Sequence, residues 1–270
     1  MEQVQSIDQL RALIGEVRAK RQGFVTNFYL DEFKHGVWIA QGDCFAEKIG
    51  DTLFVIRKDQ AFWNVFYNST SLEQLRYDLN MFTKDNSDYS MMFDVIGRDV
   101  QCQPVVTMME GIGFKNMASL VRMMRLTDAI DYTNDVSNVC RATIDDVPEV
   151  SMLLHQYFDA RVEQIPYDTE LMDFVRKGQV LLCKEQGSVL GFLIYELNNT
   201  TLYLRYWFTH PDFRDKKVGS RLLKRFFEEG RDTKRQLLWV IRTNENAIKR
   251  YRHYGFEDEN MFDYIMTNQQ

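Results

Sequence analysis

The stretch from Arg214 to Leu223, Arg-Asp-Lys-Lys-Val-Gly-Ser-Arg-Leu-Leu, has the residue types and spacing of a phosphate-binding turn. It lies between a strand-like run, Thr201 to Thr209, and an amphipathic helical run, Arg221 to Glu229. The first N–H groups of a helix have no partner inside the helix, and the helix dipole favours an anion at that end. Gly219 has no Cβ to hold a ligand away from the backbone. The segment therefore predicts an anion site where a strand turns into a helix.

The charge around this segment is opposite to that of the whole chain. Residues 214–235 contain nine Lys or Arg and four Asp or Glu, whereas the chain of 270 residues has a formal net charge of −6. We expect the main-chain N–H groups of residues 216–221 to converge on an anion as a nest. Basic side chains beyond the loop are interpreted as an ordinary solvated helix face. Lys217 leaves two alternatives: a strained positive φ, or ordinary helical angles with its cation near the phosphates.

Composition excludes several classes of function. The negative net charge argues against general affinity for nucleic acid or anionic membrane. The four cysteines have no spacing typical of a zinc site or a disulfide framework, and no His, Cys and carboxylate cluster indicates a metal. Residues 1–13 form a charged amphipathic helix rather than a signal peptide, and no apolar run is long enough to cross a bilayer. We expect a cytoplasmic protein without nucleic-acid or membrane partners, and a homodimer remains open.

The second half of the chain predicts alternating strands and helices. Pro148 suits the first turn of a helix with a carboxylate before it, and Gly178 suits the end of the next helix. The turn 186–188 joins two strands as a hairpin. We expect strands at 140–144, 179–185, 189–197, 201–209, 236–241 and 262–266, and helices at 145–158, 170–176, 221–229 and 244–254.

The first half predicts a similar set of elements. We expect helices at 7–21, 71–82 and 104–110, and strands at 44–49, 53–57, 62–67, 91–96 and 119–125. Its last part runs from Val95-Ile96 to Gly113-Phe114, as the second half runs from Val240-Ile241 to Gly255-Phe256, which favours a diverged duplication. The polar segment 127–138 is the natural boundary. The predicted fold class is α/β, with mixed α+β sheets, flanking helices and two domains, 1–130 and 138–270.

The order of elements from about Asn138 onward resembles the GCN5-related N-acetyltransferase (GNAT) fold. The family's phosphate signature is Gln/Arg-x-x-Gly-x-Gly/Ala, and Arg214 and Gly219 match it while Lys217 replaces the first glycine. A second family run, Asn-x-x-Ala-x-x-x-Tyr-x-x-x-Gly-Phe, is intact from Asn244 to Phe256. The first half resembles the family only through its last third and its strand-rich middle. The resemblance implies a tandem GNAT-like fold with a degenerate first copy.

The resemblance also implies roles for individual residues. In the family the loop cradles the pyrophosphate of acetyl-coenzyme A (acetyl-CoA), and Tyr251 corresponds to a tyrosine that protonates the leaving thiolate. A phenol can do this, although a tyrosine before Gly-Phe also packs the helix on the sheet. Asn244 would contact the pantetheine arm or only cap its helix. The loop residues implied in cosubstrate binding are Arg214, Asp215, Lys216, Lys217, Val218, Gly219 and Ser220.

In the family, the strand before the loop splays from the next strand and pairs with pantetheine, and one of its N–H groups polarises the acetyl carbonyl. Phe208 and Thr209 are the expected main-chain contributors here. A general base is also needed for the acceptor amine. Glu196 is our choice, ahead of Glu163, Tyr206 and His155, although a glutamate at a strand end is commonly only solvated.

The predicted function is direct transfer of an acetyl group from acetyl-CoA to a primary amine. In the first half, residues 67–72 lack both glycine and a basic residue, and Met109 stands where the second half has Tyr251. That half is expected not to bind coenzyme A and to serve packing, acceptor selection or dimerisation. Two alternatives remain: a regulatory protein that binds acyl-CoA without turnover, and a peptidyl-type transferase that uses aminoacyl-tRNA. The sequence does not name the acceptor.

Overall fold

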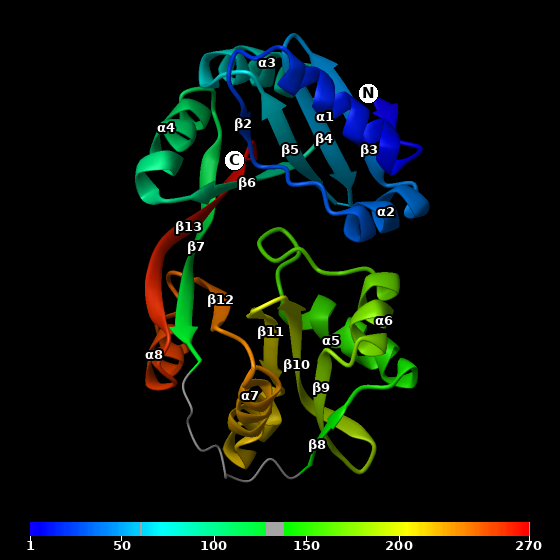
Figure 1. Cartoon of the computed structure of the whole chain (residues 1–270), viewed down its shortest axis with the longest axis vertical. Helices are drawn as coiled ribbons and strands as arrows, with labels where there is room; N and C mark the ends of the chain where they lie inside the picture. Colours follow the sequence, from blue (N-terminus) through cyan, green and yellow to red (C-terminus); the bar gives the residue numbers. More distant parts are fainter. Residues whose placement is uncertain (60, 128–137, 270) are drawn as a thin grey trace. The chain divides into compact units, whose positions relative to one another are not determined.

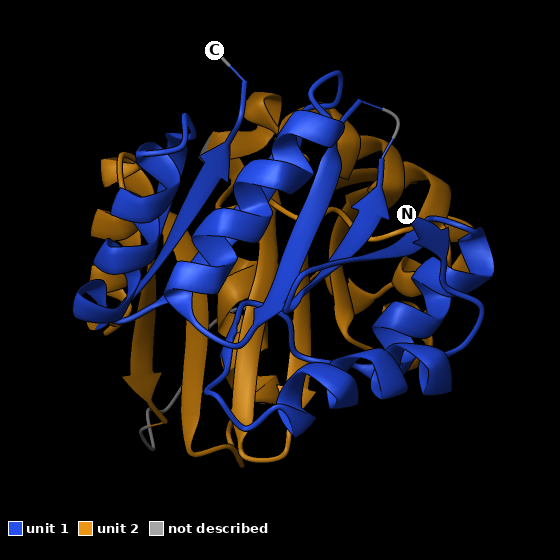
Figure 2. Cartoon of the chain, turned by 90° about the horizontal axis from the view of Figure 1, so that it is seen from above, with its two compact units in different colours: residues 1–120, 260–270 blue, residues 121–259 orange. Residues whose placement is uncertain are grey.

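The computed structural model of the chain describes residues 1–59, 61–127 and 138–269, apart from the side chain of Asp215. The chain divides into two compact units, shown in Figure 1 and coloured separately in Figure 2. Unit 1 comprises Met1–Leu120 and Asn260–Gln270, and unit 2 comprises Val121–Glu259. This division differs from the predicted ranges 1–130 and 138–270. The last strand pairs with residues 92–97, which places the end of the chain in unit 1. The expected boundary, 127–138, lies outside the described residues except at its two ends.

Unit 1 is a mixed sheet with helices on it. Its sheet order is β1-β3-β4-β5-β6-β13, with β2 paired to β5. Helices α3 and α4 pack on β4, β5 and β6 in one core that includes Phe54, Phe82, Phe93 and Met109. Its elements are β1 Glu2–Gln3, α1 Ile7–Ala19, β2 Val25–Thr26, α2 Glu32–Gln41, β3 Cys44–Ile49, β4 Thr52–Lys58, β5 Trp63–Ser69, α3 Leu72–Asp85, β6 Met91–Gly97 and α4 Asp99–Glu110. Strands β7 (Lys115–Leu126) and β13 (Glu257–Thr267) have residues in both units.

Four features of unit 1 differ from the sequence prediction. Residues 1–13 were expected to form one amphipathic helix, but Glu2–Gln3 form strand β1 and α1 begins at Ile7. Helix α2 was not predicted; Asp31 caps it by accepting from the Lys34 N–H, and Gly42 ends it with a φ of 79°. The short strand β2 was also missed. Helix α4 begins at Asp99, five residues before the predicted start at Pro104. Pro104 therefore lies inside the helix, where it lacks the N–H of one helical hydrogen bond.

Unit 2 is a sheet with helices on both faces. Its elements are β8 Val139–Arg141, α5 Val147–Tyr157, α6 Asp168–Arg176, β9 Val180–Glu185, β10 Ser188–Asn198, β11 Thr201–Thr209, α7 Val218–Glu229, β12 Arg235–Ile241 and α8 Glu245–His253, with 3₁₀ turns at Ile144–Asp146 and Pro211–Lys216. The strand order of its sheet is β7-β12-β11-β10-β9-β8. The predicted strands and helices of this half are confirmed with shifts of a few residues at their ends.

Side-chain alternation along β11 separates the two faces of this sheet. Tyr206 and Phe208 point into the core that α5 and α6 cover. On the other face, α7 lies so close to β11 that a Cβ on Gly219 would be 3.1 Å from Trp207 Cζ2 and 2.9 Å from Thr209 Oγ1. Successive strand residues point to opposite faces, which is why one strand serves both layers.

A gap between two parallel strands of unit 1 is filled by the chain itself. Strands β5 and β6 pair only at Trp63↔Met91 and Asn64↔Met92, after which they diverge. Beyond that point β2 pairs with β5 in place of β6, with Val25 opposite Ser69 and Thr26 opposite Asn68.

Asn27 completes this filling. Its side-chain oxygen accepts from the Tyr67 N–H (2.7 Å) on β5, and its Nδ2 donates to the Asp94 carbonyl (2.8 Å) on β6. Its own N–H donates to the Tyr67 carbonyl (3.3 Å). The carboxamide of Asn27 thus bonds to main-chain groups of both strands at the level where the two strands no longer pair with each other.

Replacing Asn27 by Ala is expected to destabilise unit 1 by about 2–4 kcal/mol, because it removes the acceptor of the Tyr67 N–H and the donor to the Asp94 carbonyl. Urea unfolding gives the free energy, and hydrogen exchange should show faster exchange at the Tyr67 amide. Asn116→Ala is the matched control: its side chain is exposed and bonds only to Ser119 in the described part of the chain, so the loss should stay below about 0.5 kcal/mol. Equal losses in the two variants would contradict the bridging role of Asn27.

Candidate active site

Strands β11 and β12 of unit 2 diverge just as β5 and β6 do. Their parallel pairing runs from Thr201↔Arg235 to Leu204↔Leu238 and stops there, although β11 continues to Thr209 and β12 to Ile241. At the same level, β11 has a bulge against β10, because Ile194 is opposite Tyr206 and Tyr195 is opposite Leu204. Arg205 is the extra residue of the bulge. The splay that the sequence resemblance implied is thus present.

The opening between these strands is a pocket of about 1160 Å³. Residues 204–209 of β11 and 239–241 of β12 line it, together with residues of α5, α7 and α8. The lining includes side chains from both faces of β11, such as Tyr206 on one face and Trp207 on the other. The pocket therefore joins the two faces of the sheet.

Hydrogen-bond alternation determines which main-chain groups of β11 face this opening. The His210 N–H donates to the Leu190 carbonyl (2.9 Å) on β10, so Phe208, two residues earlier, also directs its N–H and C=O toward β10. Trp207 and Thr209 direct theirs to the other side, where β12 has moved away. Phe208 and Thr209 were the expected main-chain contacts of the cosubstrate. The alternation agrees with this for Thr209, but it is Trp207, rather than Phe208, whose main-chain groups face the opening.

The N-terminus of α7 lies at one end of this opening. Lys217 has φ 55° and ψ 23°, which is the strained, positive-φ alternative, and its side chain does not cap the helix. The first helical bond is donated by Arg221 to the Lys217 carbonyl, so the N–H groups of residues 218–220 have no partner in the helix. The equivalent helix of unit 1, α3, is capped by Ser71, which accepts from the Gln74 N–H. Of these two helices, α7 is the one that begins without a side-chain cap and so presents free N–H groups to an anion.

The structure gives another reason for a glycine at position 219 than close approach of a ligand. It lies within α7, and the atoms nearest to an added Cβ belong to Trp207 and Thr209 rather than to open pocket space. Trp207 Nε1 also donates to the Gly219 carbonyl (3.2 Å). Glycine at this position lets α7 approach β11 closely, which fixes the start of the helix beside the opening.

The described lining of the pocket is rich in positive charge. It contains five Lys or Arg and a single carboxylate, Glu163. Four of these cations, Arg214, Lys217, Lys249 and Arg250, form no ion pair with a described carboxylate. Cations without counter-ions beside an uncapped helix start provide favourable conditions for a ligand with several phosphates.

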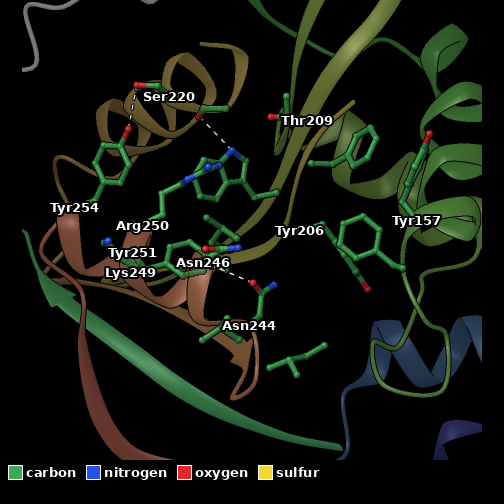
Figure 3. Close-up of a pocket in the computed structure, with 18 of the residues that line it drawn as sticks. Tyr157, Tyr206, Thr209, Ser220, Asn244, Asn246, Lys249, Arg250, Tyr251 and Tyr254 are labelled. Carbon is green, nitrogen blue, oxygen red and sulfur yellow. Dashed lines mark hydrogen bonds between the residues drawn. The ribbon is translucent and has the colours of Figure 1, made fainter. Parts of the chain in front are cut away.

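Helix α8 brings the residues of the second sequence signature to the pocket (Figure 3). Asn244 caps the helix by accepting from the Ala247 N–H (3.1 Å), which confirms the capping interpretation, and it also lines the pocket. Tyr254 donates to Ser220 Oγ (3.0 Å) and so ties α8 to the start of α7. Tyr251 lies 5.5 Å from Trp207 between ring centroids.

Tyr251 is 7% exposed, and the described residues offer its hydroxyl no hydrogen-bond partner. Burial raises the pKa of this phenol well above its ordinary value, the negative charge of Glu163 adds to the rise, and the Arg250 guanidinium opposes it. The phenol therefore keeps its proton at neutral pH. It is a neutral donor that faces the opening without a competing acceptor.

Glu163 lies in the connection between α5 and α6, on the face of the sheet opposite α7. Burial raises the pKa of this carboxyl to about 7, and the nearby Asp159 charge adds to the rise, while a main-chain hydrogen bond from Asp159 acts the other way. Its charge also raises the pKa values of Tyr206 and Tyr251, so it interacts electrostatically with groups on β11 and α8.

Some of the site residues predicted from the sequence line the pocket and others do not. Phe208, Thr209, Arg214, Lys217, Gly219, Ser220, Asn244 and Tyr251 line the pocket. Val218 is fully buried in the core, and Lys216 pairs with Glu185. The side chain of Asp215 lies outside those described.

The candidate bases also separate. Glu196 is outside the pocket lining and pairs with Arg205 at 3.4 Å. His155 is exposed and bonds the Ser151 carbonyl, and Tyr206 donates its hydroxyl to the Gln164 carbonyl (2.7 Å). Glu163 lines the pocket, although the sequence analysis preferred Glu196 as the base. Glu163 lies in a connection without a sequence motif, so nothing in the sequence marked it as the better candidate. Tyr254, Lys249 and Arg250 were missed. The three-residue helical spacing from Tyr251 could have found Tyr254, whereas Arg250 and Lys249, one and two residues before Tyr251, gave no such signal. No group of three His, Cys, Asp or Glu among the described residues could hold a metal.

Comparison with known proteins finds a family match in the half of the chain that contains this pocket. Residues 147–256 match the model of the acetyltransferase (GNAT) family. The matched residues all belong to unit 2. An uncharacterized N-acetyltransferase of Methanocaldococcus jannaschii is 26% identical over 141 residues, which span 47% of this chain and 62% of that relative. The chain thus covers less than two thirds of the relative it matches.

Solved structures show the fold of nearly the whole chain. A GCN5-related N-acetyltransferase of Sphaerobacter thermophilus superposes with a TM-score of 0.61 at 10% identity and covers 80% of this chain and 76% of its own. A tandem GNAT protein of the clavulanic acid biosynthesis pathway reaches 0.58 at 11% identity, over 90% of this chain and 97% of its own. The chain shares the fold of these structures, and unit 2 carries the match to the family model.

Replacing Gly219 by Ala is expected to lower the free energy of unfolding by about 1–3 kcal/mol, because the added methyl meets Trp207 and Thr209. The same displacement should weaken binding of coenzyme A, measured by isothermal titration calorimetry. Gly15→Ala is the matched control: it lies inside α1 with no atom within 4 Å of the added methyl, so it should be neutral or stabilise by about 0.5–1 kcal/mol. A Gly219→Ala protein as stable as wild type would contradict the close approach of α7 to β11.

Proposed function

We propose that unit 2 transfers an acetyl group from acetyl-CoA directly to a primary amine. The observation that carries this proposal is the opening between β11 and β12, which runs from the uncapped start of α7 to Tyr251 and Glu163. A long, polyanionic thioester fits such an opening: its phosphates match the helix start, and its arm can replace the missing strand partner. The match of residues 147–256 to the GNAT family model supports acyl transfer in general.

The phosphates of the cosubstrate would bind at the α7 N-terminus. The N–H groups of residues 218–220 would donate to the phosphates. Lys217 already has its strained, positive-φ conformation in the structure, so binding needs no further change of the backbone there. Arg214 and Lys217 line the pocket at this end. Lys249 and Arg250 on α8 extend the positive charge along the same wall.

The pantetheine arm would pair with the open edge of β11. Its amide groups can exchange hydrogen bonds with Thr209, which is nearer the phosphate end, and the thioester would then reach Trp207. The Trp207 N–H can donate to the carbonyl oxygen as negative charge develops on it during attack. In this arrangement the main chain of β11 provides both the alignment and the polarisation of the reacting bond.

Tyr251 would donate the proton that the thiolate of coenzyme A needs as it leaves. Its raised pKa keeps the phenol protonated until a strong base, the nascent thiolate, forms beside it in the water-poor pocket. The lack of a described hydrogen-bond partner leaves the hydroxyl available for sulfur.

Unit 1 would bind no coenzyme A. Residues 25–27 occupy the corresponding gap, Ser71 caps the corresponding helix, and Met109, in the place of Tyr251, is fully buried in the core. This half keeps the fold without the site.

We expect Tyr251→Phe to lower turnover about 10²-fold or more while leaving the affinity for acetyl-CoA nearly unchanged, because only the proton donor is removed. Thiol release during acetylation of an amine panel measures turnover, and calorimetry measures affinity. Tyr195→Phe is the matched control: this buried tyrosine of β10 bonds the Gly178 carbonyl outside the pocket, so only stability should fall, by about 1 kcal/mol. Equal turnover in wild type and Tyr251→Phe would remove the acid role of Tyr251.

Calorimetric titration of the full chain is expected to give one acetyl-CoA bound per chain. Arg214→Ala should weaken the binding by about tenfold through loss of one phosphate contact, without changing this stoichiometry. Failure of the wild-type chain to bind at millimolar concentration would overturn the proposed function. Two equivalent sites per chain would show that unit 1 binds as well.

A further inference from the structure

The wall of the pocket on the α5–α6 side carries a carboxylate without a counter-ion. Glu163 is partly buried there, and no Lys, Arg or His among the described residues pairs with it. The nearest arginine in sequence, Arg161, is engaged in a two-point contact with Asp159 (3.0 and 2.8 Å). Arg205 pairs with Glu196 and lies 5.2 Å from the centre of the Tyr203 ring. A buried carboxylate is costly without a positive partner, so a cation is the group most favoured beside it.

Four aromatic side chains line the pocket together with this carboxylate. Tyr157 lies 4.7 Å from Phe208, and Phe158 lies 5.4 Å from Tyr206, measured between ring centroids; all four line the pocket. The Tyr206 hydroxyl is already bonded to the Gln164 carbonyl, and the residue is only 4% exposed, so a ligand in the pocket meets a small part of its ring. Such rings accept an apolar body and attract an ammonium group through their faces.

A ligand with its own carboxylate has no matching partner on this wall. The two described arginines near it are held by Asp159 and Glu196. A polyamine would likewise lack a second carboxylate, since Asp159 is neutralised by Arg161. One ammonium group on an apolar body is the chemistry that matches one carboxylate among four rings.

We propose that this wall is the acceptor site, that it takes a monoamine with an apolar or aromatic body, and that Glu163 removes the ammonium proton. This proposal rests on acetyl transfer in unit 2. The donor and the acceptor then enter the opening from opposite faces of the sheet, and their reacting groups meet beside Trp207 and Tyr251.

The proton balance of the reaction is complete with these two residues. The ammonium nitrogen loses one proton to Glu163, which passes it to water. The freed lone pair forms the N–C bond while the C–S bond breaks. Tyr251 gives its proton to the departing sulfur and regains one from the nitrogen, directly or through water. The products are the amide, coenzyme A as thiol, and one proton released.

Glu163 must be ionised to act as base. Its raised pKa, about 7, predicts that kcat/KM for the amine rises with pH through neutrality. The groups that face its carboxylate are Asp159 from the same connection, Tyr206 from β11 and Tyr251 from α8. Both tyrosines have raised pKa values and stay neutral in this range. Of these groups, Glu163 is therefore the one that produces the rise of kcat/KM near pH 7, which is called the neutral limb below.

The test measures acetylation of phenethylamine, phenylalanine and spermidine by the full chain, each at several pH values, with wild type, Glu163→Gln and Glu196→Gln. Phenethylamine is expected to exceed phenylalanine and spermidine in kcat/KM by about tenfold or more. Glu163→Gln should lose about 100-fold at pH 8 and lose the limb near pH 7, while its affinity for acetyl-CoA stays within about twofold of wild type. Glu196→Gln should keep the limb, because that carboxylate is paired with Arg205 outside the pocket lining.

Folding of the variant is checked separately. A carboxyl group with a raised pKa destabilises the folded state above its unfolded pKa, so Glu163→Gln should raise the melting temperature at pH 8 more than at pH 5. A limb that persists in Glu163→Gln, or that vanishes in Glu196→Gln instead, overturns the role of Glu163. A preference for phenylalanine or spermidine overturns the acceptor class. Failure of wild type to bind acetyl-CoA is a different result, and it rejects the proposed function itself.

Discussion

The early end of the pairing between β11 and β12 is the constraint on which the rest of the site depends. After Leu204↔Leu238 the main-chain groups of Trp207 and Thr209 have no strand opposite them. Buried N–H and C=O groups need partners, so this edge must be satisfied by water or by a ligand. The bulge at Arg205 stands at the point where the strands separate. A break in regular pairing thus becomes a binding edge for an extended molecule.

The same constraint acts in unit 1 and is met differently. Strands β5 and β6 separate after Asn64↔Met92, and the freed groups bind the carboxamide of Asn27. The helix start beside that gap is closed by Ser71. One architecture therefore supports two outcomes: a gap sealed by its own chain, and a gap open to solvent with uncompensated cations around it. The difference lies in a few local residues rather than in the fold, which places the proposed chemistry in unit 2.

The sequence predicted what local patterns encode. Thr201–Thr209 alternates along its length and was found as a strand, and Asn244 begins a helix that its side chain caps. Tertiary relations were less accessible. The end of the chain pairs in unit 1 because a strand's partner depends on register with distant residues, and the segment that fills β5–β6 carries no periodicity. Glu163 follows the same rule: the proposal for it rests on its burial and on the lack of a counter-ion among the described residues, neither of which a motif records.

Hydrogen–deuterium exchange of the main-chain amides, with and without acetyl-CoA, tests the central claim most directly. The account predicts slower exchange at Trp207, Thr209 and residues 218–220 when the cosubstrate binds, and no change at Tyr67, which Asn27 already protects. Unchanged exchange along β11 in the presence of bound acetyl-CoA would contradict it, as would slowing at Tyr67 equal to that at Thr209.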